Sequence, residues 1–409
     1  MAIIVQKFGG SSVKSTDRIK RIAQRVAQTA KEGNQVVVVV SAMGKSTQNL
    51  KNMASEISSK PHPQAMDLLL STGEKVSISL LAMALEDVGV KAVPMTAYHL
   101  GIETDDNYRR ARVKVVNPNY VKEELDKGNV VVAAGFQGIT ADGHITTLGI
   151  GASDKTAVIL SASLNADKCE IYTDVDGVYT SDPRVVPDAK RLTSISCDEM
   201  LEMATSGAKV MNSEAVEWAK KYNINLVVKH SFEEGEGTMI QNYASMDDPE
   251  VVGAARSLNE SRVSLHQVSA SGGGIDVLFR KIADEKVNVD MILLSPNEGK
   301  FEVSFTVPSE QLDTTIKVVE DLKDQLQYGG YSTNSKVAKL SIVGVGMQNH
   351  HGVAARMFEA LISVGIHPEA VTTSEIKVSV IIDEKDADDG LRAVHKEFKL
   401  SDSSHEAKV

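Results

Sequence analysis

The residues of this chain that could do chemistry are lysines and carboxylates placed in loops that contain glycine. The loop Lys7–Ser12 contains Gly9 and Gly10, and the loop Gly149–Asp154 ends in a carboxylate. Glycines at the start of a helix let a phosphate approach backbone N–H groups, and a lysine beside them adds a positive charge. A carboxylate in such a loop could hold Mg²⁺ or orient a nucleophile. We therefore expect a site that handles phosphate.

A second polar stretch closes a predicted buried strand, Glu170–Thr173. It begins at Asp174–Gly177 and continues with Tyr179, Asp182 and Arg184. A hairpin turn explains the Asp-Gly pair, but it does not explain why these three later residues occur together. Phosphoryl transfer depends on positioning and charge neutralisation rather than on covalent catalysis, and this set of residues suits it. The Walker A sequence and the protein-kinase motifs are absent from the chain.

Each feature also has a simpler structural explanation. Ser153 or Asp154 could be a helix N-cap. Glu74 and Lys209, both near helix ends, could be ordinary solvated charges.

The elements that position these residues alternate between strand and helix from Met1 to about Ile240. Ile3–Val5 and Val36–Val40 are predicted strands, and the helix Thr16–Ala30 lies between them. Open α/β sheets bind ligands where such parallel strands end. Further predicted elements are helices at 47–58, 63–88, 155–164, 200–205 and 213–222, and strands at 91–95, 130–135, 144–148 and 226–229. The pattern predicts, for residues 1–240, an α/β domain with a mostly parallel sheet covered by helices on both faces.

The alternation stops at residues 241–260, which we predict to be a linker. Residues 261–335 and 336–409 then form a weak internal repeat, and each copy has the β-α-β-β-α order of a ferredoxin-like domain. The pattern leaves open whether the C-terminal segment completes the first copy. Copies this small are expected to pack together.

The composition is that of an acidic globular protein. Among 409 residues, 44 Lys+Arg face 55 Asp+Glu, which gives a net charge of −11, and aromatic residues make up 4%. Because basic blocks and stacking platforms are missing, we expect neither nucleic acid nor a membrane as a partner. Two isolated cysteines, Cys169 and Cys197, no signal peptide and no apolar run of about 18 residues predict a cytoplasmic protein.

Several motifs occur in an order that resembles the aspartokinases. They are Lys7–Ser12 (KFGGSS), Ser41–Gly44 (SAMG), Thr72–Glu74 (TGE), Gly135–Gly138 (GFQG), Tyr172–Gly177 (YTDVDG) and Thr373–Ile376 (TSEI). The resemblance covers essentially the whole chain and is greatest to the lysine-pathway isozymes of Gram-positive bacteria. It implies an amino-acid-kinase fold followed by two ferredoxin-like ACT domains. The implied reaction is ATP- and Mg²⁺-dependent phosphorylation of the β-carboxylate of L-aspartate to 4-phospho-L-aspartate, the first step towards lysine, threonine and methionine.

The resemblance also implies roles for residues of the first domain. Lys7 would neutralise charge on the transferring phosphate, and Asp154 would organise the metal and the reacting groups. Glu74 would face the ammonium group of the substrate. The aspartate site would include Ser41, Thr47, Glu74 and Ser153, and the ATP site would include Lys7, Gly9, Gly10, Thr173, Asp174, Tyr179, Arg184 and Lys209. Magnesium would enter as Mg-ATP, and no separate metal site is implied.

For the ACT pair, the resemblance implies an amino-acid effector, lysine with or without threonine. The implied effector residues are Ser271 and Asp290 in the first copy, and Met347, Asn349, His350, Val353, Ser374 and Glu375 in the second. ACT domains usually bind effectors between chains, so the resemblance implies a homodimer or a higher homo-oligomer.

The departures from the family pattern fall mainly in the substrate motifs. The family loop usually reads Gly-Arg-Gly-Gly-Ser-Asp, and its arginine grips a substrate carboxylate, whereas Ile150 and Ala152 stand here. A bidentate arginine–carboxylate contact contributes roughly 1.5–3 kcal/mol. We therefore expect weaker aspartate binding unless another cation substitutes, for example Lys155. The stretch Tyr98–Arg112 and the loop Asn349–Gly352 also differ from the family.

Two other functions are considered beside an aspartokinase. One is a divergent paralogue that phosphorylates another small carboxylate, which Ile150 and Tyr98–Arg112 would favour. The other is a non-catalytic ACT amino-acid sensor, and the presence of Lys7, Glu74 and Asp154 counts against it. Met246 could also start a separate ACT-only subunit.

Overall fold

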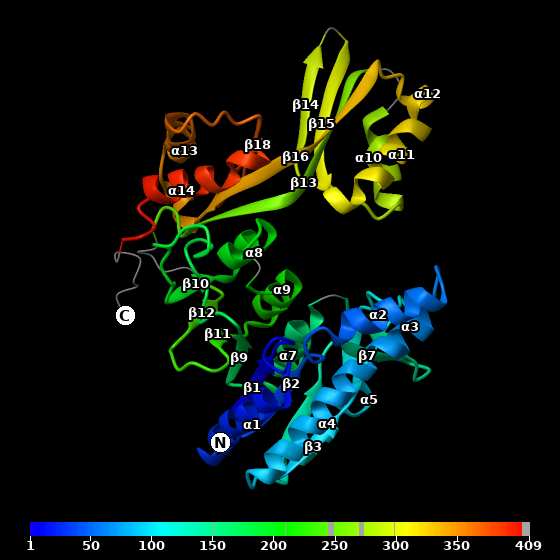
Figure 1. The fold of residues 1–409 in the computed structure, drawn as a ribbon, viewed down its shortest axis with the longest axis vertical. Helices are drawn as coiled ribbons and strands as arrows, with labels where there is room; N and C mark the ends of the chain where they lie inside the picture. Colours follow the sequence, from blue (N-terminus) through cyan, green and yellow to red (C-terminus); the bar gives the residue numbers. More distant parts are fainter. Residues whose placement is uncertain (150, 209, 244–248, 270–273, 298, 403–409) are drawn as a thin grey trace.

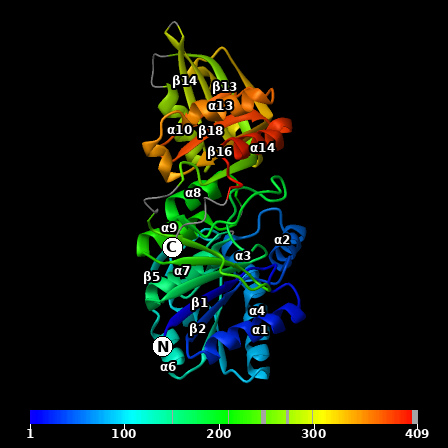
Figure 2. The ribbon, with the colours of Figure 1, turned by 90° about the vertical axis from the view of Figure 1, so that its left-hand side faces the viewer.

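The computed structural model describes residues 1–149, 151–208, 210–243, 249–269, 274–297 and 299–402. Ile150, Lys209, Met246 and Ser271, which the sequence analysis discusses, lie outside these ranges. The chain forms an N-terminal part and a C-terminal part that lie one above the other along the long axis of the molecule (Figures 1 and 2).

The N-terminal part is built on an eight-stranded sheet with the order β10-β12-β11-β9-β1-β2-β6-β3. Its strands are β1 (Ile3–Phe8), β2 (Gln35–Val40), β3 (Ala92–Met95), β6 (Val130–Ala134), β9 (Lys168–Thr173), β10 (Ser194–Ser196), β11 (Leu226–His230) and β12 (Thr238–Gln241). All neighbours pair in parallel except β11 and β12. The predicted mostly parallel sheet is confirmed.

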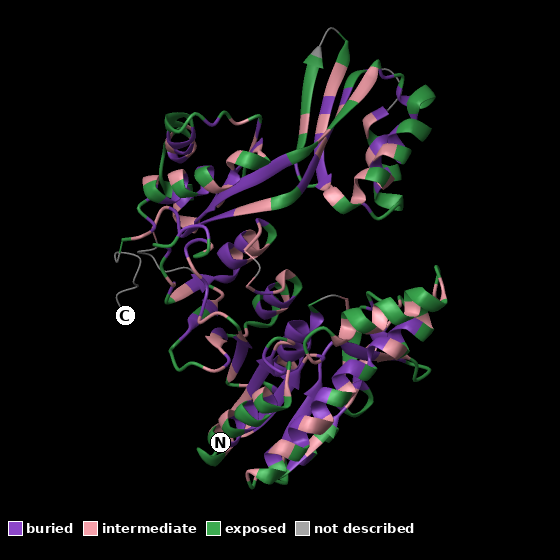
Figure 3. Cartoon of the chain, in the orientation of Figure 1, coloured by how far each residue is buried: buried purple, intermediate pink, exposed green. Residues whose placement is uncertain are grey.

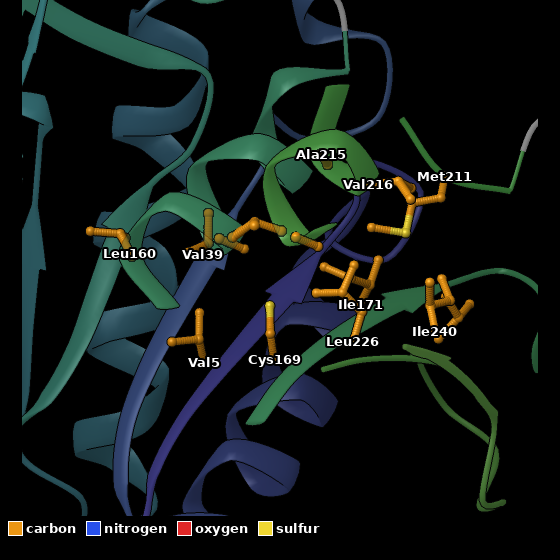
Figure 4. Close-up of a cluster of buried hydrophobic side chains, with 14 of the residues drawn as sticks. Val5, Val39, Leu160, Cys169, Ile171, Met211, Ala215, Val216, Leu226 and Ile240 are labelled. Carbon is orange, nitrogen blue, oxygen red and sulfur yellow. The ribbon is translucent and has the colours of Figure 1, made fainter. Parts of the chain in front are cut away.

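Helices cover both faces of this sheet. One face carries α1 (Thr16–Lys31) and α4 (Thr72–Asp87), and the other carries α7 (Ala152–Leu164), α8 (Cys197–Thr205) and α9 (Ser213–Tyr222). In β2, Val36, Val38 and Val40 pack in the cluster of α1 and α4, whereas Val37 and Val39 pack in the cluster of α7 and α9. Strand side chains alternate between faces, so a valine run buried on both sides specifies a central strand. Figure 4 shows part of the cluster of α7 and α9, in which Ile171 lies beside Leu226, and Figure 3 shows that the strands at the centre of the molecule are largely buried.

A smaller sheet and four short helices lie beside the main sheet. The sheet has the order β5-β4-β7-β8, with β4 (Ile102–Thr104), β5 (Val113–Val116), β7 (Gln137–Thr140) and β8 (Ile145–Thr147). The helices are α2 (Ser46–Ile57), α3 (Pro63–Leu70), α5 (Ala97–Leu100) and α6 (Asn119–Asp126). Strands β7 and β8 pair antiparallel.

The single helix predicted over 63–88 is two helices, α3 and α4, that meet at Ser71. The Ser71 hydroxyl donates to the carbonyl of Leu68, and the side chain is buried. Taken together, Pro63–Asp87 is long and apolar enough to span a membrane, with a mean hydropathy of 1.4 over its most apolar window, but half of that window is buried in the protein. Because α4 packs its apolar face against α1 and the sheet, we interpret this stretch as core.

The C-terminal part is one six-stranded antiparallel sheet, with the order β14-β15-β13-β16-β18-β17. Its strands are β13 (Gly253–Ser269), β14 (Ile292–Asn297), β15 (Lys300–Pro308), β16 (Gly330–Val343), β17 (Ala370–Thr373) and β18 (Lys377–Asp383). Its α-helices are α10 (Gly274–Asp284), α11 (Leu312–Asp321), α12 (Lys323–Leu326), α13 (Val353–Ser363) and α14 (Ala387–Glu397). Short 3₁₀ turns occur at Ser309–Gln311, Val345–Asn349 and Glu384–Asp386.

Two helical clusters divide this sheet into two units. The first unit packs α10–α12 against β13 and β15, and the second packs α13 and α14 against β16 and β18. The long strands β13 and β16 run through both units, which lie side by side in Figure 1.

The predicted linker over 241–260 is wrong for its last part. Gly253–Ser257 pair with Val343–Lys339, so β13 begins inside the second unit before it continues into the first. The sequence Gly253-Ala254-Ala255 lacks the alternation of apolar and polar residues that is typical of a strand. The space beside Met203 admits no larger side chain, because a Cβ at Gly253 would lie 2.8 Å from Met203 Cε. The first unit is therefore inserted between two segments of the second. Helix α14 packs in the core of the second unit, so the C-terminal segment does not complete the first copy.

Candidate active site

Lys7 and Asp154 form an ion pair where β1 ends and α7 begins. Lys7 Nζ lies 2.6 Å from Asp154 Oδ1, and each side chain is only 11% exposed. Asp154 Oδ2 also accepts a 3.4 Å hydrogen bond from the backbone N–H of Asn212. Because Asp154 lies in the first turn of α7, the unpaired N–H groups of that helix end lie close to the lysine.

The loops after β1 and β2 pack against each other beside this pair. The N–H of Gly44 donates to the carbonyl of Gly10 over 3.0 Å. A Cβ at Gly10 would lie 2.9 Å from the carbonyl oxygen of Ala42, which is closer than side chains normally come, and a Cβ at Gly9 would lie 3.3 Å from Lys7 Nζ. Backbone, rather than side chains, therefore surrounds the lysine ammonium on this side.

Glu74 is buried, so its interpretation as a solvated surface charge is wrong. It lies in the first turn of α4, is 3% exposed, and accepts a 3.0 Å hydrogen bond from the N–H of Ala42 through Oε1. Burial raises the pKa of Glu74 to about 7, and the backbone hydrogen bonds offset only part of this effect. Its Oε2 atom is buried and accepts no hydrogen bond from any described residue. This oxygen is free to accept a hydrogen bond from a ligand.

The other expected aspartate-site residues come from the same edge of the sheet. Ser41 follows β2 and its N–H donates to the carbonyl of Phe8, while Thr47 lies in the first turn of α2. Ser153 lies in the first turn of α7, and a Cβ at Gly135 would lie 2.7 Å from Ser153 Oγ. Glycine at 135 thus lets α7 approach the end of β6.

A cavity of ≈790 Å³ is lined by four of the eight expected ATP-site residues, whereas Lys7, Gly9 and Gly10 do not line it. Thr173, Asp174, Tyr179 and Arg184 all line it, whereas Lys209 lies outside the described residues. Tyr179 donates a 2.8 Å hydrogen bond to Asp176, and Arg184 forms an ion pair with Asp182 over 2.8 Å. The loop after β9 therefore presents acids, an aromatic ring and a guanidinium to one space.

The opposite wall of this cavity comes from the C-terminal part. Residues Ala254–Asn259 of β13 and Leu391 of α14 line it together with the loop after β9. The sequence did not predict this wall, because the β13 residues that form it fall in the predicted linker over 241–260. Residues 251–256 read VVGAAR, a stretch without the alternation that would have indicated a strand.

Lys155 does not supply the cation suggested as a replacement for arginine at position 150. Its Nζ atom lies 2.7 Å from Glu214 Oε2 and 5.9 Å from the centre of the Trp218 ring. The side chain is buried against α9, so it serves the packing of α7 on α9.

A second cavity, of ≈700 Å³, lies on the α1 side of the sheet over β9 and β11. Glu170 lies in its floor and is 5% exposed. Burial alone would raise the pKa of Glu170, but the hydrogen bond from Gln6 and the charges of Lys229 and Lys168 lower it to about 2. Lys168 and Lys229 reach the same carboxylate oxygen over 3.0 and 3.2 Å, so this network joins β1, β9 and β11.

Comparison with known proteins shows which family the chain belongs to. The sequence profile of the amino acid kinase family matches residues 2–230, and an ACT domain profile matches residues 340–398. The chain is 46% identical to the aspartokinase of Bacillus sp. strain MGA3 over 406 residues, which cover 99% of both proteins. It is 46% identical to aspartokinase 2 of Bacillus subtilis over 98% of both. The chain belongs to the aspartokinase family.

Solved aspartokinase structures share the fold. The aspartate kinase of Synechocystis is 41% identical, with a TM-score of 0.55 over 97% of this chain and 70% of that one. Escherichia coli aspartokinase III in complex with aspartate and ADP superposes with a TM-score of 0.82 over 97% of this chain and 99% of that one, at 24% identity. The same enzyme with lysine and aspartate gives a TM-score of 0.77 at 25% identity. The amino-acid-kinase and ACT assignments from the sequence are confirmed.

The expected effector residues lie in two places. In the second ACT unit, Met347 and Val353 are buried, and Gln348 donates a 3.3 Å hydrogen bond to Glu375. This contact joins the turn that contains Met347, Asn349 and His350 to the loop that contains Ser374 and Glu375. These residues therefore come together around one end of the second unit.

In the first ACT unit, Asp290 is already engaged by a lysine of the chain itself. Its carboxylate forms a short ion pair with the ammonium of Lys339, which is 4% exposed and also lies 3.7 Å from Glu260. The same ammonium lies 3.5 Å from the carbonyl of Thr205, the last residue of α8. Lys339 thus contacts the first unit, the second unit and the kinase domain.

Proposed function

We propose that this chain transfers the γ-phosphoryl group of Mg-ATP to the β-carboxylate of L-aspartate and releases ADP and 4-phospho-L-aspartate. The observation that carries this proposal is the buried Lys7–Asp154 pair at the meeting point of two glycine loops, the second of which is hydrogen-bonded to the buried carboxylate of Glu74. A carboxylate nucleophile is already ionised at neutral pH. The reaction therefore needs no catalytic base, and a site that only positions groups and neutralises charge is sufficient.

Lys7 is placed to stabilise the phosphoryl group as it moves. Its ammonium faces the backbone of Gly9 and lies beside the first turn of α7, where N–H groups favour an anion. A point charge aimed at the developing charge of the transition state acts strongly in a site shielded from water.

Asp154 fits the role of the protein ligand for the magnesium of Mg-ATP. Magnesium takes oxygen ligands, usually one or two carboxylates completed by phosphates and water. Among the described residues no group of three or more histidine, cysteine or acidic side chains forms a metal cluster of its own. When bound with ATP, magnesium would neutralise charge on the β- and γ-phosphates.

Glu74 fits the role of recognising the substrate ammonium. Its free, buried Oε2 atom would gain an ionic hydrogen bond from an ammonium group, which would offset the cost of burying its charge. Ser41, Thr47 and Ser153 would complete the aspartate pocket. Gly9, Gly10, Thr173, Asp174, Tyr179, Arg184 and Lys209 would bind ATP.

We further propose feedback regulation by lysine, with or without threonine, at the ACT units. The amino-acid kinase and ACT profiles and the lysine complex of the E. coli enzyme support this. We also propose a homodimer or higher homo-oligomer formed through the ACT units, whose sheet ends in the open edge strands β14 and β17. The two free, buried cysteines and the acidic charge fit work in the cytoplasm.

Replacement of Lys7 tests the catalytic proposal. We expect Lys7→Met to lower kcat for ADP release by about 10²–10³-fold, because one preorganised charge is lost. Lys20→Met, which removes an exposed lysine of α1, is the matched control and should retain the kcat of the unmodified protein. Equal kcat for Lys7→Met and the unmodified protein would contradict the proposed role.

A further inference from the structure

The basic groups described so far leave one carboxylate of the proposed substrate without a positively charged partner. L-aspartate has two carboxylates, of which one reacts and the other must be held. Lys7 is paired with Asp154, and Lys155 is paired with Glu214 of α9. Glu74 adds a further carboxylate to the site. A second cation near the start of α7 is therefore required to bind the carboxylate that does not react.

Arg110 lies next to the loop that leads into α7. An ideal Cβ on Gly149 would lie 3.9 Å from Arg110 Cγ. The neighbouring Ala111 belongs to the same buried cluster as Phe136 and Ala152, and Ala152 immediately precedes Ser153. The arginine and the expected aspartate pocket are therefore parts of one local packing unit.

The backbone on both sides of Arg110 is fixed by buried hydrogen bonds. Asp67 is fully buried, and its Oδ2 atom accepts from the N–H of Arg109 over 2.9 Å and from the N–H of Thr147 over 2.8 Å. The N–H of Ala111 donates to the carbonyl of Thr147 over 2.9 Å. Arg109 adopts a φ of +72°, a conformation that costs free energy for a residue with a side chain. The fold thus uses a buried carboxylate and a strained residue to hold this loop against β8.

The guanidinium of Arg110 is available to a ligand. The side chain is exposed, and within the described ranges it makes no hydrogen bond or ion pair of its own. Arginine on a fixed backbone suits this task, because its planar group binds a carboxylate through two parallel hydrogen bonds and little freedom is lost on binding.

We infer that Arg110 is a substrate-binding residue that holds the α-carboxylate of L-aspartate. This inference rests on the proposed function, since it names the group that binds the second acid of that substrate. It also gives a role to the stretch Tyr98–Arg112, which differs from the family in sequence.

The test is steady-state kinetics of Arg110→Met with Mg-ATP and L-aspartate. We expect the KM for aspartate to rise by at least about tenfold, as the loss of a charged hydrogen bond predicts. The KM for ATP and kcat should change by less than about twofold, because the interaction is made equally in the ground state and the transition state. Arg110→Lys, which keeps the charge but not the planar group with its two parallel donors, should recover part of the affinity that Arg110→Met loses.

Two controls separate substrate binding from a structural role and from the proposed function itself. Lys114→Met removes an exposed cation from β5, in the same segment, and should leave the aspartate KM unchanged. An unchanged Tm for Arg110→Met would show that the loop is intact. An aspartate KM that is equal in Arg110→Met and the unmodified protein overturns the inference. The absence of turnover with aspartate in the unmodified protein would instead overturn the proposed function.

Discussion

At the scale of single residues, the site depends on burial that the sequence does not display. Glu74 and Asp67 are acidic residues, a type usually found at the surface, yet the structure buries both of them. Glu74 has one oxygen without a hydrogen bond, whereas both oxygens of Asp67 accept hydrogen bonds, from Arg109 and Thr147. Burying a charge costs free energy unless it is paired, so these two positions are where a ligand contact and a loop anchor are expected.

Glu74 should give the enzyme a pH dependence near neutrality. Its pKa is raised to about 7, so below this pH it is mostly protonated and cannot pair with an ammonium group. We expect kcat/KM for aspartate to fall about tenfold per pH unit as the pH decreases below 7. In Glu74→Gln this slope should be absent and kcat/KM should be low throughout, whereas Glu86→Gln, at an exposed position of α4, should retain the slope.

The raised pKa of Glu74 also predicts that stability changes with pH in the direction opposite to activity. A carboxyl group whose pKa is raised on folding, here from 4.5 to about 7, costs nothing below pH 4.5 and destabilises the fold as the pH rises through 7. Above pH 7 the cost approaches about 3 kcal/mol. Glu74→Gln should therefore be more stable than the unmodified protein at pH 8, by urea unfolding, although it is less active. A less stable Glu74→Gln at pH 8 would contradict the burial of an ionised Glu74.

At the scale of elements, polar networks as well as apolar packing hold the central strands in register. Glu170 on β9 accepts hydrogen bonds from Gln6 on β1 and from Lys229 on β11. Its pKa is lowered from 4.5 to about 2, so the ionised form stabilises the fold fully above pH 4.5, and this contribution is lost as the pH falls towards 2.

We expect Glu170→Gln to lose about 3 kcal/mol of stability at pH 7, as measured by urea unfolding. The difference from the unmodified protein should shrink as the pH is lowered from 4.5 towards 2, because the carboxylate is then protonated. Glu32→Gln, at the exposed end of α1, is the control and should stay within about 0.5 kcal/mol. A difference that is constant from pH 7 to pH 3 would contradict this account.

The elements also show what can be predicted from a sequence. Apolar runs such as Val36–Val40 identify strands, and glycine loops identify the edge where ligands bind, because both are set by local chemistry. The break at Ser71 and the strand start at Gly253 were missed, because tertiary packing decides them. Gly253 and its alanine neighbours form a strand only because β16 and Met203 leave room for small side chains alone.

Site residues that belong to local motifs can likewise be predicted from the sequence, whereas those brought in by tertiary packing cannot. Lys7, Asp154, Thr173, Asp174, Tyr179 and Arg184 were named from motifs, and the structure gathers them at one edge of the sheet. The wall formed by β13 could not be named, because it comes from a segment that looks like a linker and lies far along the chain.

At the scale of the whole molecule, the kinase domain and the second ACT unit pack against each other through apolar residues. Val252, Ala255 and Val343 of the ACT sheet pack in the main cluster of the kinase domain, and Val185 and Val186 of the kinase domain pack in the cluster of the second unit. The cavity that we propose to bind ATP lies between the two parts. Because β13 belongs to the ACT sheet and also lines this cavity, we expect a change in the ACT sheet to reach the cavity through β13.

Lys339 should couple the effector site to the kinase domain. It binds Asp290, an expected effector residue, and lies near the carbonyl of Thr205 at the end of α8. We expect Lys339→Met to change the effector concentration for half-inhibition by at least about fivefold, with kcat and both KM values within about twofold when no effector is present. Lys336→Met, at an exposed position of the same strand, should behave as the unmodified protein. An unchanged inhibition curve for Lys339→Met would contradict this coupling.

The central claim is that this chain makes an acyl phosphate from L-aspartate. The most direct measurement is to incubate it with Mg-ATP, L-aspartate and hydroxylamine, which traps an acyl phosphate as a hydroxamate, and to quantify hydroxamate and ADP together. We predict equimolar ADP and aspartyl hydroxamate from the unmodified protein, and a loss of both in Lys7→Met. ADP release without hydroxamate, or neither product at saturating aspartate while ATP still binds, would contradict the claim.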